Sequence, residues 1–494
     1  MSKAESCPTS NCATTCTTSC APAGDTQAVL DWMATEEYKE KNFAREALVI
    51  NPARTCQPYG AMLCALGIEG CLPFLHGSQG CAAYFRSALT RHVREPIAMV
   101  SDSMTEDAAV FGGQANLIEG LKNAYATYKP SIIGMFSSCM AEVIGDDMKS
   151  FIINARTQGA VPEDFPIAYA NTPSFVGSHI TGYDNMLKGL LNSLADTRNG
   201  KWTNGRLYVV PGFDLYAGNL REYKRMIKAM GIYMTMLPDP TETLDSPNTG
   251  EYNMYQPGTT MAELADALNA SGFLFLQKYS TTGTQKFVKN VQKIATETVT
   301  MPIGVQNTDA FLMTLQQMTG KAIPAELEAE RGRAVDAAVD AHQYIHGKRF
   351  ALYGDPDLLL GLVGFLMEIG GMPVHIVCSN GNDAFTKEME ALLATSQYGA
   401  EGKVYSGKDL WHMRSLLLTD PVDMLIGDTH GKQIAKDAKV PLARIGYFMT
   451  DRVHLHRQPI VGYQGAINLI TMLANIFIDE YDRNCPSERF EMLR

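Results

Sequence analysis

The sequence lacks three features that would assign it to common classes of protein. It has no run of about 18 apolar residues, so we expect no membrane span. Its net charge of -11 leaves no basic excess to neutralise phosphates, which argues against nucleic-acid binding. It contains neither a G-x-x-x-x-G-K-S/T loop nor a G-x-G-x-x-G turn after a strand. ATP or NAD binding by this chain is therefore not expected.

The first residues, MSKAESCPTSNC, also lack the apolar stretch of a secretory signal, so we expect a cytoplasmic protein. In that compartment its 11 cysteines stay reduced unless they bind metal, and an odd number cannot all pair as disulfides. Residues 1–25 are rich in Ser, Thr and Cys and poor in apolar side chains. This composition predicts a disordered tail.

Three apolar segments, 131–136, 207–210 and 349–353, are each followed by a Gly- or Asp-containing turn and a helical pattern. In the second case the helix has one apolar stripe and ends at Gly231; the stripe consists of Leu220, Tyr223, Met226, Ile227 and Met230. Strands that alternate with helices indicate parallel sheets. We therefore predict an α/β fold of three Rossmann-like domains with mainly parallel sheets flanked by helices. Their predicted bounds are 26–205, 206–345 and 346–494, the last with C-terminal helices.

Three cysteines lie in Gly-, Pro- or Ser-rich segments that predict turns: Cys56, Cys81 and Cys139. Turns leave a thiolate accessible and place backbone N–H groups near it. Cys139 also follows the strand at 131–136, and ligands of parallel sheets bind beyond the carboxyl ends of strands. Three cysteines are too few for a Cys₄ cluster site. The residues alone therefore support a metal site and unrelated loop thiols about equally.

The other cysteines give weaker indications. Cys64 and Cys378 lie in apolar runs and are predicted to pack in the core. The tail cysteines are spaced without the C-x-x-C pairs that zinc and cluster sites favour, so no fixed role is assigned to them; they are Cys7, Cys12, Cys16 and Cys20. Cys71 and Cys485 are not assigned a role.

Long ordered motifs run through the chain from about residue 31 to about residue 478. They are CQPYG from Cys56, HGSQGC from His76, REP from Arg94, SDSMTEDAAVFGG from Ser101, CMAEVIGDD from Cys139, NTPSFVGSH from Asn171, ERGR from Glu330, HGKRFALYGDPD from His346 and DRVHLHR from Asp451. In these motifs and their order the sequence resembles the beta chains of nitrogenase.

The resemblance implies a complex of two alpha and two beta chains, with an eight-iron, seven-sulfur P-cluster at each alpha–beta interface. The beta chain supplies three cysteines, which match Cys56, Cys81 and Cys139, and the alpha chain supplies three more. Ser174 matches a serine whose oxygen binds iron when the cluster is oxidised. Without the resemblance, Ser174 would be assigned as an ordinary turn serine after proline.

By the same resemblance, a separate iron protein hydrolyses ATP and delivers electrons, and dinitrogen is reduced at a cofactor in the alpha chain. No catalytic residue is therefore assigned here, and the chain alone should reduce nothing. Phe111 matches a residue of the docking face for the iron protein. From the sequence pattern alone it is an ordinary helix residue, because Ser103–Glu106 has the form of a capping box.

A second metal site is also implied. Asp336 and Asp340 are four residues apart, so they would share one face of a helix. Such a pair is more often a solvated acidic face, but carboxylates suit a hard cation. The resemblance implies a mononuclear iron or calcium ion between two beta chains, with the Arg94 carbonyl and the Glu95 side chain supplied by the second chain. His454 and His456 lack zinc-ligand spacing and are predicted to pack or to lie at an interface.

Three alternatives remain at this stage. The chain could be the beta chain of a vanadium or iron-only nitrogenase, although SDSMTED is more similar to the molybdenum type. It could be a scaffold for cofactor assembly, although the three cysteines together with Ser174 argue against this. It could also be a structural α/β protein with reduced thiols, which iron analysis would distinguish from the others.

Overall fold

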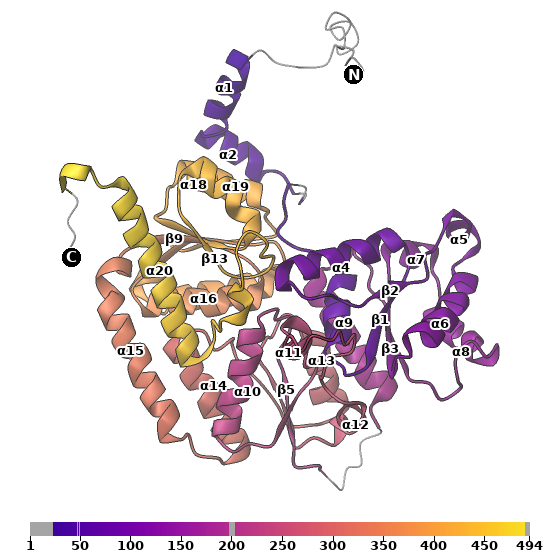
Figure 1. Cartoon of the computed structure of the whole chain (residues 1–494). Coiled ribbons are helices and arrows are strands. Elements are labelled where there is room, and N and C mark those ends of the chain that lie inside the picture. The colour runs from indigo at the N-terminus through magenta and orange to yellow at the C-terminus, as the bar shows by residue number, and fades with distance from the viewer. Residues whose placement is uncertain (1–22, 47, 49, 197–202, 490–494) are drawn as a thin grey trace, which may run out of the picture.

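In the computed structural model, which describes residues 23–46, 48, 50–196 and 203–489, helices flank three separate sheets (Figure 1). Every strand pair is parallel. The predicted α/β fold class is thus confirmed. Among the helices described, none combines the length and the apolar character needed to cross a membrane.

The first sheet has the order β2-β1-β3-β4. Every residue of β1 and β3 is buried, because helices cover both faces of the sheet. The strands are β1 Cys71–His76, β2 Val100–Ser101, β3 Ile132–Ser137 and β4 Ile167–Ala170. The helices are α3 Gln57–Leu66, α4 Gln79–Val93, α5 Glu106–Phe111, α6 Gln114–Tyr128, α7 Cys139–Ile144, α8 Met148–Thr157 and α9 His179–Leu194.

The second sheet has the order β6-β5-β7-β8. Its strands are β5 Leu207–Val210, β6 Met234–Met236, β7 Gly272–Phe275 and β8 Thr296–Thr298. The helices that follow them are α10 Ala217–Ala229, α11 Thr241–Leu244, α12 Met261–Ala265, α13 Thr282–Lys286, α14 Gly304–Thr319 and α15 Ala325–Ile345. All five residues of the predicted apolar stripe around α10 are buried.

The third sheet has the order β11-β10-β9-β12-β13. Its strands are β9 Arg349–Tyr353, β10 Met372–Cys378, β11 Lys403–Ser406, β12 Met424–Gly427 and β13 Leu442–Arg444. Its helices are α16 Pro356–Glu368, α17 Asp383–Leu393, α18 Leu410–Thr419, α19 Lys432–Ala438 and α20 Gly462–Asn484. Cys64 and Cys378 are both buried, as predicted, and so is Cys71.

Two segments pack against helices of a different predicted domain from their own. Helices α14 and α15 were placed with the second sheet, but they pack against α16 and α20 of the third domain (Figure 1). Helix α2, Glu36–Phe43, was placed with the first sheet, yet it packs on α18. There Asn42 donates to the Trp411 carbonyl at 3.1 Å, and Arg45 pairs with buried Asp409 at 2.6 Å. Both segments therefore contact the third sheet's helices, while the domain bounds themselves stay a prediction.

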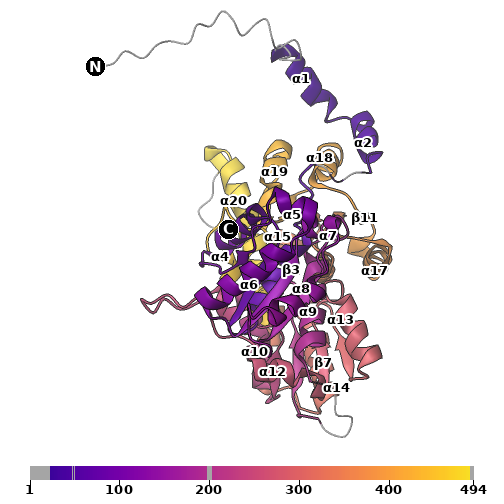
Figure 2. The same cartoon turned by 90° about the vertical axis from the view of Figure 1, so that its right-hand side faces the viewer.

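Helix α1, Ala23–Trp32, begins inside the segment 1–25 that was predicted as a tail, and it extends away from the body of the chain (Figure 2). Residues 1–22, with their four cysteines, lie outside the described residues.

Buried carboxylates join the domains to one another. Asp184 on α9 accepts the backbone N–H groups of Gly283 and Thr284 at the start of α13. Asp357 on α16 accepts three successive N–H groups of residues 278–280 after β7. Burial raises the pKa of Asp357 to about 7, and these three donors oppose that rise. His179, at the start of α9, contacts Asp355 of the third domain at 2.9 Å.

Helices α3 and α9 contact each other backbone to backbone. A Cβ atom on Gly60 of α3 would lie 1.8 Å from the His179 carbonyl oxygen. A Cβ atom on Gly182 of α9 would lie 1.9 Å from the Gln57 carbonyl oxygen. Only glycine permits this approach at either position. The contact places Cys56, just before α3, beside the loop that enters α9.

We expect Gly60→Ala to destabilise the protein by about 3 kcal/mol, because the methyl group overpacks the α3–α9 contact. The matched control is Gly332→Ala, also within a helix, where a Cβ meets nothing within 4 Å. That change should instead stabilise the chain by about 0.5 kcal/mol. Urea unfolding followed by circular dichroism measures both, and equal stability of Gly60→Ala and the unsubstituted chain would refute the contact.

Candidate metal centre

The three predicted cysteines all lie at helix N-termini. Cys56 is the N-cap of α3, Cys81 lies in the first turn of α4, and Cys139 is the first residue of α7. All three are exposed. The prediction of turns was wrong for Cys81 and Cys139, because serine hydroxyls at 78 and 138 cap these helices just before them. Unpaired N–H groups at a helix N-terminus stabilise a thiolate.

The topology of the first sheet brings two of these helix N-termini together. Strands β1 and β3 are neighbours, and the order of the sheet reverses between them. In open α/β sheets, ligands bind in the crevice beyond the carboxyl ends of strands at such a reversal. Cys81 follows β1 and Cys139 follows β3. Both thiols therefore emerge at the edge where this fold ordinarily binds ligands.

The three thiols also influence one another electrostatically. Burial raises the pKa of Cys56, the Ser174 hydroxyl lowers it, and Cys139 raises it further. Burial likewise raises the pKa of Cys81, and both Cys139 and Cys56 add to that rise. Yet no three His, Cys, Asp or Glu side chains in the described ranges are arranged to hold one metal ion.

Ser174 lies on the loop between β4 and α9, and Gln57 fastens this loop to the start of α3. The buried Gln57 amide donates to the Pro173 carbonyl at 2.8 Å and to the Val176 carbonyl. The sequence analysis did not identify Gln57, although it lies within the CQPYG motif. Its amide therefore sets the position of Ser174 relative to Cys56.

The Ser174 hydroxyl is buried and has no hydrogen-bond partner of good geometry in the described part of the chain. It is nevertheless close enough to Cys56 to lower the pKa of that thiol. A buried polar atom without a partner is unusual in a native protein and requires an explanation. Coordination of a metal beside Cys56 would satisfy it.

Exposed apolar side chains follow Cys81, Cys139 and Ser174 closely in the sequence. They are Tyr84, Val143, Phe175 and Val176, each more than half exposed. Each lies within four residues of Cys81, Cys139 or Ser174 in the sequence. Large apolar side chains exposed close to a candidate site are typical of a protein interface. We call these four residues the apolar rim.

Phe111 is the last residue of α5 and is 87% exposed. The helix begins at Glu106, with Thr105 as its N-cap and without a side-chain capping bond. The predicted capping box at Ser103–Glu106 was therefore wrong. Ser103 adopts a left-handed conformation, with φ of 52°, that cannot serve as an N-cap.

The four residues predicted for the second metal lie in different parts of the fold. Asp336 and Asp340 are exposed on α15, whereas Arg94 ends α4 with a left-handed φ of 67° (Figure 1). The side chain of Glu95 accepts a hydrogen bond from Ser246 at 3.0 Å. One chain therefore does not bring the two halves together.

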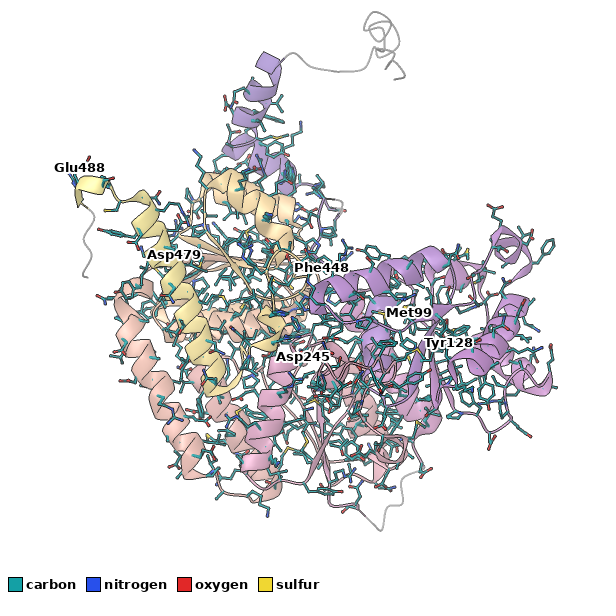
Figure 3. The ribbon with its side chains drawn as sticks, in the orientation of Figure 1. Met99, Tyr128, Asp245, Phe448, Asp479 and Glu488 are labelled. Carbon is teal, nitrogen blue, oxygen red and sulfur yellow. The ribbon has the colours of Figure 1, made fainter. Side chains whose placement is uncertain are left out.

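The two histidines of the DRVHLHR motif lie near the junction of the three domains. His456 is buried, its ring lies 5.6 Å from that of His92, and burial lowers its pKa to about 4. The neighbouring Arg457 pairs with Asp245 at 2.8 Å, and Asp245 and Phe448 are labelled at this junction in Figure 3. His456 therefore packs in the core.

Comparisons with known proteins give a consistent result. A family model described as "Nitrogenase component 1 type Oxidoreductase" matches residues 56–478. The chain is 53% identical to the nitrogenase molybdenum-iron protein beta chain of Nostoc sp. over 94% of this chain and 90% of that one. It is 50% identical to the beta chain of Azotobacter vinelandii over 93% and 90% of the two chains.

Among solved structures, a chain of "Nitrogenase Cp1 at pH 6.5" superposes with a TM-score of 0.88 at 41% identity, over 91% of this chain and 98% of that one. A chain of "Nitrogenase Cp1 at pH 5" has a TM-score of 0.69 at 16% identity and shares the fold. The match extends over 92% of that chain and 90% of this one.

Replacing Ser174 by Ala should raise the pKa of Cys56 further, because the hydroxyl that lowers it is removed. At pH 8 the metal-free chain would then hold less Cys56 thiolate, and iodoacetamide would alkylate Cys56 more slowly. Peptide mass spectrometry measures the rate. Cys81, on which Ser174 has no such effect, is the internal control. Unchanged or faster alkylation of Cys56 would show that Ser174 does not contact it.

Proposed function

The chain belongs to the nitrogenase component 1 type oxidoreductases, and from this premise we propose that it is the beta subunit of a molybdenum-iron protein that binds a P-cluster at its contact with an alpha chain. One observation carries the proposal. Cys56, Cys81 and Cys139, each at a helix N-terminus, are close enough to influence one another, and beside Cys56 lies the buried Ser174 hydroxyl, which has no hydrogen-bond partner of good geometry among the described residues.

These residues fit a shared cluster. Cys56, Cys81 and Cys139 would supply thiolates, and an alpha chain would supply the remaining ligands. Ser174 would add a hard alkoxide oxygen, which favours more oxidised iron. When bound, such a cluster stores electrons and passes them toward the alpha-chain cofactor for reduction of dinitrogen to ammonia. The chain's own contribution is to hold the negative charge of the thiolates with helix N–H groups.

The surface around the thiols supports a partner chain. The apolar rim would be buried by the alpha chain, which would also exclude water from the cluster. On α5, the exposed Phe111 would contact the iron protein that hydrolyses ATP, since this chain has no ATP-binding loop of its own. The complex would act in the cytoplasm, where its thiols remain reduced.

A second metal site would join two beta chains. Asp336 and Asp340 of one chain would meet the Arg94 carbonyl and Glu95 of the other, around an iron or calcium ion. The exposed carboxylate pair on α15 supports this, as does the left-handed turn at Arg94 that ends α4. Oxygen ligands of this kind suit a hard cation.

Metal analysis of the complex, purified anaerobically through a tag on this chain, tests the cluster. We expect high iron with molybdenum and a second large chain. Cys139→Ala should lose cluster iron because a thiolate ligand is removed. Cys485→Ala, which removes a thiol outside the site, should keep it.

Iron with vanadium, or with neither metal, would instead indicate an alternative nitrogenase or an assembly scaffold. Intact complex without iron would refute the cluster.

Asp336→Asn combined with Asp340→Asn should weaken the contact between beta chains, because two anionic ligands of the proposed ion are lost. Sedimentation at decreasing protein concentration should show dissociation into alpha–beta halves earlier than for the unsubstituted complex. Glu326→Gln with Glu328→Gln removes the same charge from the first turn of α15 and is the matched control. Identical dissociation of both double variants would argue against an ion at Asp336 and Asp340.

A further inference from the structure

A buried histidine flanked by two carboxylates lies beneath the candidate metal centre. His76, the last residue of β1, is fully buried. Its Nδ1 contacts the Asp102 carboxylate, and its Nε2 contacts the Asp146 carboxylate at 3.0 Å. Both carboxylates are almost completely buried as well. Burying three ionisable groups costs desolvation free energy, and apolar side chains could fill the same space without that cost. Their presence therefore points to a role other than stability.

On one side this network contacts the segments that carry two of the thiols. The backbone N–H of Ser138, which precedes Cys139, donates to the His76 carbonyl at 2.9 Å. Asp102 accepts the backbone N–H of Gly77 at 2.8 Å, at the start of the turn that leads to Cys81. The backbone of His76 and the side chain of Asp102 are therefore hydrogen-bonded to the segments that lead into both helices.

On the other side the network reaches the end of α5. Asp146 accepts the backbone N–H of Gly113 at 3.1 Å, two residues after Phe111. A Cβ atom on Gly113 would lie 2.6 Å from His76 Cε1 and 2.8 Å from the Asp146 carboxylate, so there is no free space between them. A displacement of Gly113, just after α5, would therefore push directly on the side chains of His76 and Asp146.

Helices α5 and α7 also pack on each other. In Figure 2 the two helices lie side by side. Met104 and Ala108 form a small apolar cluster with Ala141, which lies on α7 two residues after Cys139. Two routes thus connect α5 to α7, the apolar cluster and the polar network. The polar network also reaches β1 and the turn before Cys81, and the backbone N–H of Met104 meets the same turn by donating to the Gly77 carbonyl at 3.0 Å.

We propose that His76 and Asp146 are positioning residues that couple the docking surface at Phe111 to the thiols of Cys81 and Cys139. The inference rests on the proposed function. When the iron protein presses on α5, Asp146 and His76 pass the displacement to the two helix N-termini that hold the cluster. Docking and electron acceptance are thereby linked through five hydrogen bonds rather than through the cluster ligands themselves.

The test uses the complete complex with its alpha chain. Asp146→Asn keeps the shape of the side chain and an oxygen for Gly113 but removes the charge opposite His76. His76→Gln is the second variant. Asp147→Asn is the matched control, because it removes a carboxylate at the next residue, which is exposed and only caps α8. Phe111→Ala serves as the variant defective in docking alone.

For each variant we would measure the iron content and the KM for the iron protein. Stopped flow gives the rate of the first electron transfer within the docked complex. Electron paramagnetic resonance gives the change in the cluster's signal when the iron protein binds. We expect Asp146→Asn to keep its iron and a KM within about twofold. Its electron-transfer rate should fall about 10-fold, because small misplacements of positioned groups have effects of this size or larger. The resonance change should shrink.

Phe111→Ala should behave in the opposite way, with a raised KM and a normal rate once docked. Asp147→Asn should match the unsubstituted complex. Normal transfer in iron-loaded Asp146→Asn and His76→Gln would overturn the coupling, and so would loss of iron in both, since their role would then be structural. Absence of iron from the unsubstituted complex would refute the proposed function itself, which is a distinguishable result.

Discussion

The contact between α3 and α9 is the constraint on which the candidate site depends. Because Gly60 and Gly182 have no side chains, the two helix backbones touch, and the loop before α9 is pressed against the residue before α3. Gln57 then fastens that loop through its amide, which leaves Ser174 beside Cys56. A hydroxyl and a thiol that are 118 positions apart in the numbering thus become neighbours through helix packing and the hydrogen bonds of Gln57.

Electrostatic interactions matter both near the thiols and at the contacts between domains. Near the thiols, Cys56, Cys81 and Cys139 each lie at a helix N-terminus, where the helix dipole favours negative charge and so suits an anionic cluster. Between domains, Asp184 and Asp357 accept backbone N–H groups of the second domain, and burial opposes their ionisation. The same chemistry, carboxylate or thiolate against backbone N–H, therefore both joins the domains and prepares the site.

Much of the fold could be predicted because buried parallel strands require continuous apolar runs. The segments 131–136, 207–210 and 349–353 match β3, β5 and β9 for this reason. The sequence was a weaker guide to which sheet each helix packs with. Helix α15 has an exposed face and a buried face like any surface helix, and nothing in its pattern shows that the buried face meets α20. Helix starts at Cys81 and Cys139 were missed since Gly- and Ser-rich stretches suit turns and N-caps equally.

Some residues of the candidate site could likewise be predicted from the sequence, and others could not. The sequence predicted the three cysteines and Ser174 as ligands, but only through the ordered motifs that show the family; the residue types alone left the cysteines undecided and favoured a turn role for Ser174. Gln57, and the network of His76 with Asp102 and Asp146, emerged only from the tertiary structure. Their roles depend on hydrogen bonds between segments 26 to 119 residues apart, and a polar side chain carries no mark in the sequence of the partner it will meet once buried.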